Sequence, residues 1–186
     1  SISGGRFAEY DPDEVSGYQI SASKINGALS NVEWIIGTKQ EDYLIASTAG
    51  NKLDGGENND ILIGNTGADQ LIGGDGADNI KGFSGIDLTT GNEGADTIEG
   101  GSDNDKLDAG SGNDVLYGGA GADQLIGGSG NDVYKFYTGD VVVGETITEA
   151  SNGGSDTVSI FTSSDLSPIS AASFDEIEEI QFAGAN

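Results

Sequence analysis

Aspartates recur every nine residues through the middle of the chain, and their carboxylates are the groups whose spacing could do chemistry. A nine-residue frame runs without insertion from Gly37 to Lys135 and gives eleven phrases. Asn51 holds the sixth place of the second phrase, and the other ten phrases have aspartate there: Asp42, Asp60, Asp69, Asp78, Asp87, Asp96, Asp105, Asp114, Asp123 and Asp132. Carboxylates repeated in one phase can bind cations or, as pairs, transfer protons.

The remaining composition decides which cation would suit these carboxylates. The chain has no His and no Cys, so carboxylates and turn carbonyls are the available ligands, and all of them are oxygen. Soft and borderline metals are poorly served by such a set. Six or more flexible oxygen ligands favour Ca²⁺ over the stricter octahedron of Mg²⁺. The sequence therefore predicts calcium sites.

Charge and motifs exclude several functions. The chain has 186 residues, of which 32 are acidic and 7 basic, and its formal net charge is −25. Such a surface repels nucleic acid and anionic membranes, and no apolar run reaches the length of a membrane span. There is no catalytic triad, HExxH motif, phosphate loop or dinucleotide loop, so we expect no enzyme. Paired carboxylates leave a glycosidase open in principle, but the repeat already accounts for them.

The phrases must form turns and short strands. Glycine is too frequent in the first six places for a helix. The last three places, such as residues 124–126, are typical of a short strand whose middle residue points inward. The fourth place is Gly in seven phrases but Asn58 and Asp103 in two others, which predicts a positive φ there. Two phrases per coil would give two facing parallel sheets with a turn at each edge.

Stacked turns would align the aspartates. Successive turns on one edge would lie about 4.8 Å apart, with alternate phrases on opposite edges. Two ladders of carboxylates at this spacing would repel strongly unless cations lay between the rungs. The core is thin, with about one inward side chain per phrase. A metal site that is absent from the unfolded chain adds its binding energy to folding, so we expect Ca²⁺ to switch folding on.

The phrases resemble the RTX (repeats-in-toxin) nonapeptide G-G-x-G-x-D-x-U-x, a calcium-binding repeat. The best preserved are residues 73–81, 91–99, 109–117, 118–126 and 127–135. The resemblance implies an all-β fold, a right-handed parallel β-roll with two nonapeptides per coil. It implies that backbone carbonyls and the sixth-place Asp hold Ca²⁺ between turns n and n+2. It also implies type I export from a Gram-negative bacterium and folding outside the cell.

On this resemblance the metal ligands come from phrases 3 to 11. The expected carboxylates are Asp60, Asp69, Asp78, Asp87, Asp96, Asp105, Asp114, Asp123 and Asp132. The expected glycines are Gly73, Gly74, Gly76, Gly91, Gly94, Gly110, Gly112, Gly118, Gly119, Gly121, Gly127, Gly128 and Gly130. Pairs of turns two phrases apart give about seven ions, which would move the charge from −25 to about −11. Gln40, Ala49 and Asn51 depart from the motif and weaken the prediction of ions in the first two phrases.

The repeat divides the chain into three parts. We expect residues 1–36 to form an N-terminal β flank or cap, residues 37–135 the β-roll, and residues 136–186 a C-terminal β cap or export-associated segment. The whole is expected to be a secreted or cell-surface module, part of a large adhesin or surface protein. One alternative is the calcium-binding and secretion module of a secreted protease, lipase or polysaccharide-modifying enzyme. Another is a solenoid whose outer face binds a regular surface such as ice or a polysaccharide.

The flanks carry further candidates. Residues 29–37 and 174–182 are typical of strands that extend or cap the coil. A lone twelfth turn is indicated at Gly153, Gly154 and Asp156. Either an extra calcium site or a solvated turn is indicated at Asp11, Asp13 and Glu14.

The outward seventh and ninth places differ between the two expected sheets. Odd phrases are more apolar there, and a soluble protein rarely leaves such a patch bare. We therefore expect flanking segments to cover the odd-phrase sheet. The side chains expected to be more buried are Ile61, Ile63, Val115 and Tyr117. Those expected to be more exposed, on the even-phrase sheet, are Gln70, Lys106, Asp108 and Gln124.

Overall fold

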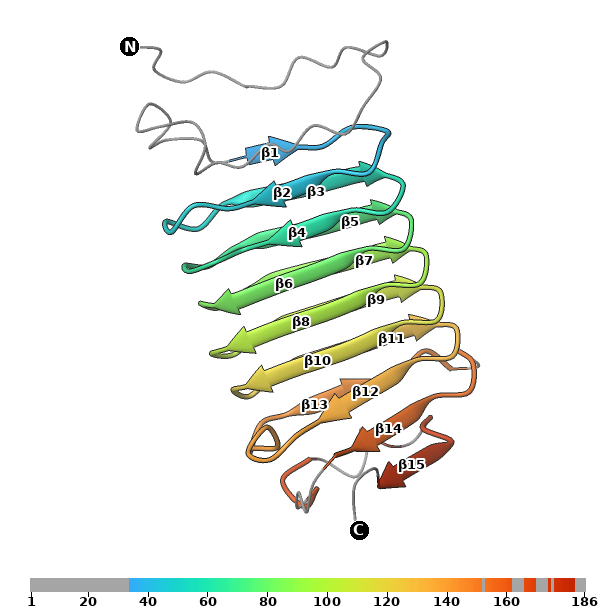
Figure 1. Cartoon of the computed structure of the whole chain (residues 1–186). Coiled ribbons are helices and arrows are strands. Elements are labelled where there is room, and N and C mark those ends of the chain that lie inside the picture. Colours follow the sequence, from blue (N-terminus) through green and yellow to red (C-terminus); the bar gives the residue numbers. More distant parts are fainter. Residues whose placement is uncertain (1–33, 152, 162–165, 170–173, 175, 183–186) are drawn as a thin grey trace, which may run out of the picture.

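The computed structural model describes residues 34–151, 153–161, 166–169, 174 and 176–182 (Figure 1). The elements of these residues are all β-strands. No helix in the described part of the chain is long and apolar enough to cross a membrane. The acidic group of the N-terminal flank lies outside the described residues: Asp11, Asp13 and Glu14.

In the described part of the chain, fifteen parallel strands stack into a β-solenoid. In chain order they are β1 (Trp34–Ile36), β2 (Tyr43–Ile45), β3 (Lys52–Glu57), β4 (Ile61–Ile63), β5 (Gln70–Asp75), β6 (Asn79–Ser84), β7 (Leu88–Glu93), β8 (Thr97–Ser102), β9 (Lys106–Ser111), β10 (Val115–Ala120), β11 (Gln124–Ser129), β12 (Val133–Phe136), β13 (Thr146–Thr148), β14 (Thr157–Ile160) and β15 (Glu179–Phe182). Odd-numbered strands from β1 to β13 form a seven-stranded sheet, and the even-numbered strands with β15 form an eight-stranded one (Figure 1). The predicted all-β parallel roll with two phrases per coil is confirmed.

Each phrase sends its eighth residue into the space between the sheets. From β1 to β12, neighbouring strands of one sheet are 18 residues apart in register, as when Leu53 pairs with Leu71 and Leu107 pairs with Leu125. The inward side chains are completely buried: Leu44, Leu53, Leu62, Leu71, Ile80, Thr89, Ile98, Leu107, Leu116, Leu125 and Tyr134. The repetitive core is therefore one column of side chains per sheet, which is thin for a chain of this length.

The strands are longer than the three residues expected from the sequence. From β5 to β11 each spans six residues, because pairing continues through the first three places of the next phrase, as in Gln70–Asp75. The second-place residue stays in the ladder at positive φ, 118° at Gly74 and 77° at Phe83. The turns are reduced to places four to six. The positive φ predicted at the fourth place is confirmed, at 73° for Asn58 and 85° for Asp103.

The prediction that flanking segments bury the apolar residues of the odd-phrase sheet, which is the eight-stranded one, is wrong at Ile61. Ile61 is 41% exposed, whereas Lys106 on the other sheet is half-buried. Lys106 is in register with Leu88 and Gln124 on the two adjacent strands, so it has a neighbouring strand on each side. Half-buried residues occur on both sheets: Ile63, Val115 and Tyr117 on one and Asp108 on the other. Gln70 and Gln124 are exposed, as expected.

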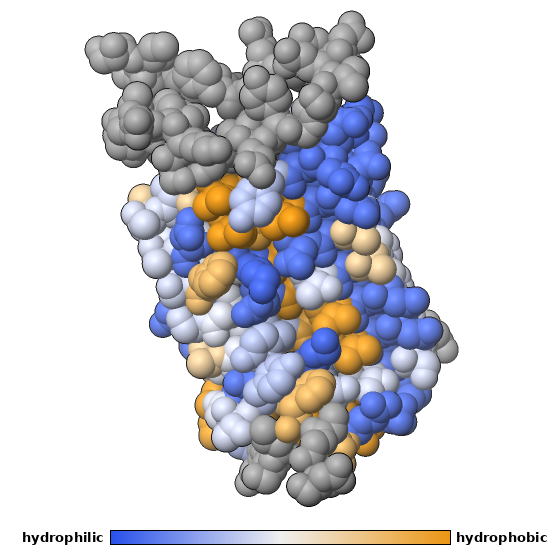
Figure 2. All heavy atoms as spheres, viewed as in Figure 1, coloured by the Kyte–Doolittle hydropathy of each residue, from blue (hydrophilic) through white to orange (hydrophobic). Residues whose placement is uncertain are grey.

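Aromatic side chains cover the C-terminal part of this sheet. Tyr137 packs edge-on against Tyr117 with ring centroids 5.2 Å apart, and it stacks on Phe161 at 4.8 Å. On the face that Figure 2 shows, apolar side chains reach the surface in separate patches among hydrophilic ones. The faces therefore differ in local packing rather than as one covered and one open side.

Candidate calcium sites

Two ladders of buried aspartates follow opposite edges of the solenoid. From Asp42 to Asp114, the backbone N–H of each ladder aspartate donates to Oδ1 of the aspartate 18 residues further along the chain. Asp78 N lies 2.8 Å from Asp96 Oδ1, and Asp96 N lies 2.7 Å from Asp114 Oδ1. On the other edge Asp105 N lies 2.8 Å from Asp123 Oδ1. The stacked turns thus use one oxygen of each carboxylate as an internal hydrogen-bond acceptor.

The other oxygen of these carboxylates has no partner. Nine Oδ2 atoms are buried and accept no hydrogen bond from the residues that the structure describes: those of Asp60, Asp69, Asp78, Asp87, Asp96, Asp105, Asp114, Asp123 and Asp132. They belong to phrases 3 to 11 of the frame. A buried acceptor without a donor costs about 1–3 kcal/mol, and a cation with oxygen ligands would remove that cost. The donor set therefore fits Ca²⁺.

The first two phrases satisfy their own side chains instead. Asp42 Oδ2 accepts hydrogen bonds from Thr38 N at 2.6 Å and from Thr38 Oγ1 at 2.9 Å. Asn51 Oδ1 accepts one from Ser47 N at 2.6 Å. These turns close on local hydrogen bonds, so their geometry gives no reason to place an ion there.

A space beside each unpartnered oxygen depends on glycine at the first place of the phrase. A methyl group at Gly64 would lie 2.9 Å from Asp69 Oδ2 and 2.7 Å from the carbonyl oxygen of Gly82 on the next coil. At Gly100 the corresponding distances, to the ladder carboxylate and the next coil's carbonyl, are 2.6 and 2.7 Å. The space is thus lined by a carboxylate and a carbonyl from different coils. Ala109 takes the first place in the ninth phrase and is the exception in this series.

The predicted glycines occupy three places in the turns. First-place residues are Gly73, Gly91, Gly118 and Gly127; second-place residues are Gly74, Gly110, Gly119 and Gly128; fourth-place residues are Gly76, Gly94, Gly112, Gly121 and Gly130. Those of the second and fourth places have positive φ, for example 118° at Gly74 and 137° at Gly112. A methyl group at either would overlap a carbonyl oxygen of the preceding coil. These glycines let successive turns stack closely enough to bring oxygens together.

Burial raises the pKa of the ladder carboxyl groups, although the backbone N–H that each one accepts lowers it. The pKa rises to about 7 for Asp60, Asp96 and Asp105, and to about 6 for Asp69 and Asp132. The two flanking rungs raise the pKa of Asp96 further by repulsion. The same burial raises the pKa of Asp78, Asp87, Asp114 and Asp123. Ionising the ladder carboxyl groups without a bound metal is therefore unfavourable. Bound divalent cations would favour the ionised carboxylates instead.

Both ladders continue beyond the nonapeptide frame. Asp123 N donates to Glu145 Oε2 at 3.1 Å, and Asp132 N donates to Asp156 Oδ1 at 2.9 Å. Asp156 N in turn donates to Glu178 Oε2 at 2.7 Å. The predicted twelfth turn is confirmed, since β14 pairs with β12 directly after it. Glu145 and Glu178 were missed because they lie outside the nine-residue spacing.

A weaker signal in the sequence could have found them. Each added carboxylate precedes a strand triplet whose central residue is aliphatic. The resulting pattern, acid-x-aliphatic-x, corresponds to D-x-U-x in the nonapeptide, where U is the inward-pointing residue. The three instances are residues 145–148, 156–159 and 178–181. A search on that tetrapeptide alone, without the fixed spacing, would have extended both ladders.

This parallel β-solenoid has two edges of buried carboxylates, and one oxygen of each from Asp60 to Asp132 accepts no hydrogen bond from the described residues. That is the architecture of a calcium-binding β-roll. The family model of the RTX calcium-binding nonapeptide repeat matches the chain in four copies, at residues 30–62, 54–88, 81–116 and 99–134. These copies together span more than half of the chain, which therefore belongs to the RTX calcium-binding repeat family. No curated protein matches the sequence.

Proposed function

We propose that this chain is a calcium-dependent folding module, exported by type I secretion and folded outside a Gram-negative cell, in a large adhesin or surface protein. Its role is structural rather than catalytic. The observation that carries the proposal is the set of nine buried Oδ2 atoms that accept no hydrogen bond from the described residues. Such a set is unfavourable in the free chain and is relieved by oxygen-liganded cations.

The proposed calcium-binding unit is residues 37–135, with ions in phrases 3 to 11. Each ion would lie between turns two phrases apart, with ladder carboxylates and turn carbonyls as ligands. About seven ions are expected, and each would offset two of the charges that give the chain its net −25. Strands β13 to β15 extend both sheets and serve as the C-terminal cap in this proposal.

Export explains why a switch of this kind is useful. Without Ca²⁺ the thin core and the repelling ladders favour an unfolded chain, which is the form that can pass through a secretion channel. Binding energy at sites absent from the unfolded chain then drives folding. Affinities suited to extracellular modules, about 10⁻⁴–10⁻³ M, would keep the switch off in a cytoplasm and on outside the cell.

A calcium titration followed by circular dichroism tests the folding switch. In chelator the spectrum should be that of a largely unfolded chain, and a β-sheet signal should appear over a narrow range of Ca²⁺ concentration. Calorimetry of the same titration should count about seven ions. Mg²⁺ at equal concentration should produce much less signal. A β-sheet spectrum that is identical in chelator and in Ca²⁺ would overturn the proposal.

The setting of the module has a separate test. The complete reading frame that encodes this chain should contain adhesin or surface-protein domains. A catalytic domain in that reading frame would overturn the adhesin setting and leave the calcium module as the tail of a secreted enzyme.

A further inference from the structure

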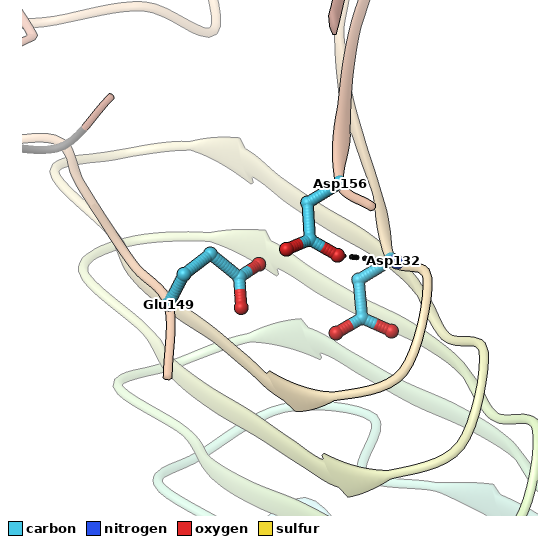
Figure 3. A group of neighbouring side chains, drawn as sticks. All are labelled: Asp132, Glu149 and Asp156. Carbon is cyan, nitrogen blue, oxygen red and sulfur yellow. Dashed lines mark hydrogen bonds between the residues drawn. The ribbon is translucent and has the colours of Figure 1, made fainter. Parts of the chain in front are cut away.

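Three carboxylates from different turns converge near the C-terminal end of the solenoid. One oxygen each from Asp132, Glu149 and Asp156 lies within 4.8 Å of the other two (Figure 3). Asp132 and Asp156 belong to the ladder on the edge of the eight-stranded sheet, in the turns before β12 and β14. Glu149 directly follows β13 of the seven-stranded sheet. The group therefore joins the two sheets.

Two oxygens in this group are buried without a partner among the described residues. Asp132 is fully buried, and its Oδ1 accepts a hydrogen bond from Asp114 N at 2.8 Å while its Oδ2 accepts none. Glu149 Oε1 accepts a hydrogen bond from the hydroxyl of Tyr134, and its Oε2 accepts none. Tyr134 is itself fully buried, so it fixes the carboxylate of Glu149 from inside the core.

The convergence repeats the pattern of the regular turns with one change. At Gly64 and Gly100, the space beside the ladder oxygen is lined on its other side by a carbonyl from the next coil. The three atoms nearest to a methyl group at Gly127 would be the Tyr134 hydroxyl oxygen, Glu149 Oε1 and Asp132 Oδ2, all within 2.6 Å. The side chain of Glu149 thus stands where the repeat would place a backbone carbonyl.

We propose that Asp132, Glu149 and Asp156 bind one further Ca²⁺, which locks the last turns of the two sheets together. This site rests on the proposed calcium-dependent function and adds an ion that the nonapeptide frame does not provide. Three carboxylates meet here, whereas one carboxylate and one neutral carbonyl line the space at Gly64 and Gly100, so the site carries more negative charge than a regular turn. Tyr134 is a positioning residue, because its hydroxyl holds one oxygen of Glu149 and leaves the other directed at the cation.

Calorimetric counting of Ca²⁺ on matched variants tests the site. Glu149→Gln keeps the size of the side chain and an acceptor for the Tyr134 hydroxyl, but it removes the charged ligand. It should bind one ion fewer than the wild-type chain, or bind that ion about tenfold more weakly. Glu93→Gln, which makes the same charge change at an exposed position, should bind as the wild type does.

Terbium luminescence provides a second measurement that does not require Glu149→Gln to fold. Tb³⁺ in the proposed site would lie close to the Tyr134 ring and emit when tyrosine is excited. Tyr134→Phe should abolish most of that emission, keep the number of bound Ca²⁺ ions, and weaken the last ion about tenfold. Emission equal to that of the wild-type chain would overturn the proposal.

The outcomes separate this proposal from the one on which it rests. A wild-type chain that neither binds Ca²⁺ nor folds with it would refute the general function. A wild-type chain that folds with Ca²⁺ would leave the function intact. If Glu149→Gln then binds the same number of ions with the same affinities, the terminal site alone is refuted.

Discussion

Acid should stabilise the metal-free roll, because its buried carboxyl groups are easier to accommodate when protonated. Folding raises the pKa from the ordinary value of 3.8 to about 7 at Asp60, Asp96 and Asp105. A group with a raised folded-state pKa stabilises the fold fully below its unfolded pKa, and that contribution is lost as the pH rises through the folded pKa. We therefore expect the free energy of unfolding of the calcium-free chain to increase as the pH falls from about 7 to about 4.

The size of the effect follows from these pKa values. A rise from 3.8 to about 7 corresponds to about 4 kcal/mol for a carboxyl group completely removed from water. Solvent near the turns screens part of this, and we take about 1 kcal/mol per group between pH 8 and pH 5. The three aspartates with a pKa of about 7 then contribute about 3 kcal/mol together. That is a large fraction of the net stability of a small domain.

Circular dichroism in chelator at pH 8 and pH 5 measures this directly, with sedimentation to confirm a soluble monomer. The β-sheet signal should be larger at pH 5. Asp96→Asn keeps the acceptor for Asp78 N but does not titrate, so its gain on acidification should be smaller by about 1 kcal/mol. The exposed control Glu93→Gln should gain as much as the wild type. A soluble chain with the same unfolded spectrum at both pH values would refute the reasoning.

Position along the ladder should decide the effect of losing a carboxylate. Asp96→Ala removes a proposed ligand that faces two neighbouring rungs, so it should raise the Ca²⁺ midpoint of folding about tenfold. Asp42→Ala loses only local hydrogen bonds, so it should change that midpoint less than about twofold. Equal shifts in the two titrations would contradict this. Gly100→Ala places a methyl group 2.6 Å from a ladder oxygen and should also raise the midpoint. An unchanged midpoint in Gly100→Ala would refute the role of this space.

The parts of the fold that repeat could be read from the sequence because one period controls them. A spacing of nine residues, with two phrases per coil, fixed which residues point inward and which aspartates share an edge. The register of 18 residues between Leu53 and Leu71 follows from the same count. Asn58 and Asp103 replace glycine at the fourth place, and these two residue types tolerate a positive φ better than other non-glycine residues. Their occurrence there therefore predicted the positive φ.

Features that depend on neighbours rather than on the period were not accessible in this way. Phe83 at φ 77° shows that the second place also needs positive φ, but the frequent glycine there does not by itself distinguish a turn from a continuing strand. The exposure of Ile61 was misjudged because hydropathy describes a residue and not the side chains beside it. Glu145 and Glu149 were overlooked because the loop before β13 breaks the nine-residue frame. In the structure Glu145 continues one ladder and Glu149 lies beside Asp132.

The buried side-chain oxygens have different surroundings at the two ends of the roll. This difference indicates where along the chain we expect calcium to be needed most. At the N-terminal end, Thr38 and Ser47 donate hydrogen bonds to the side chains of Asp42 and Asn51, so the first coil closes with neutral donors. Repeat proteins need atypical terminal repeats, and this coil acts as one without metal. At the C-terminal end, carboxylates such as Glu149 are added to ladders that are already acidic. Each added carboxylate increases repulsion in the metal-free chain and attraction for a divalent cation, so we expect calcium dependence to be greatest where the repeat ends.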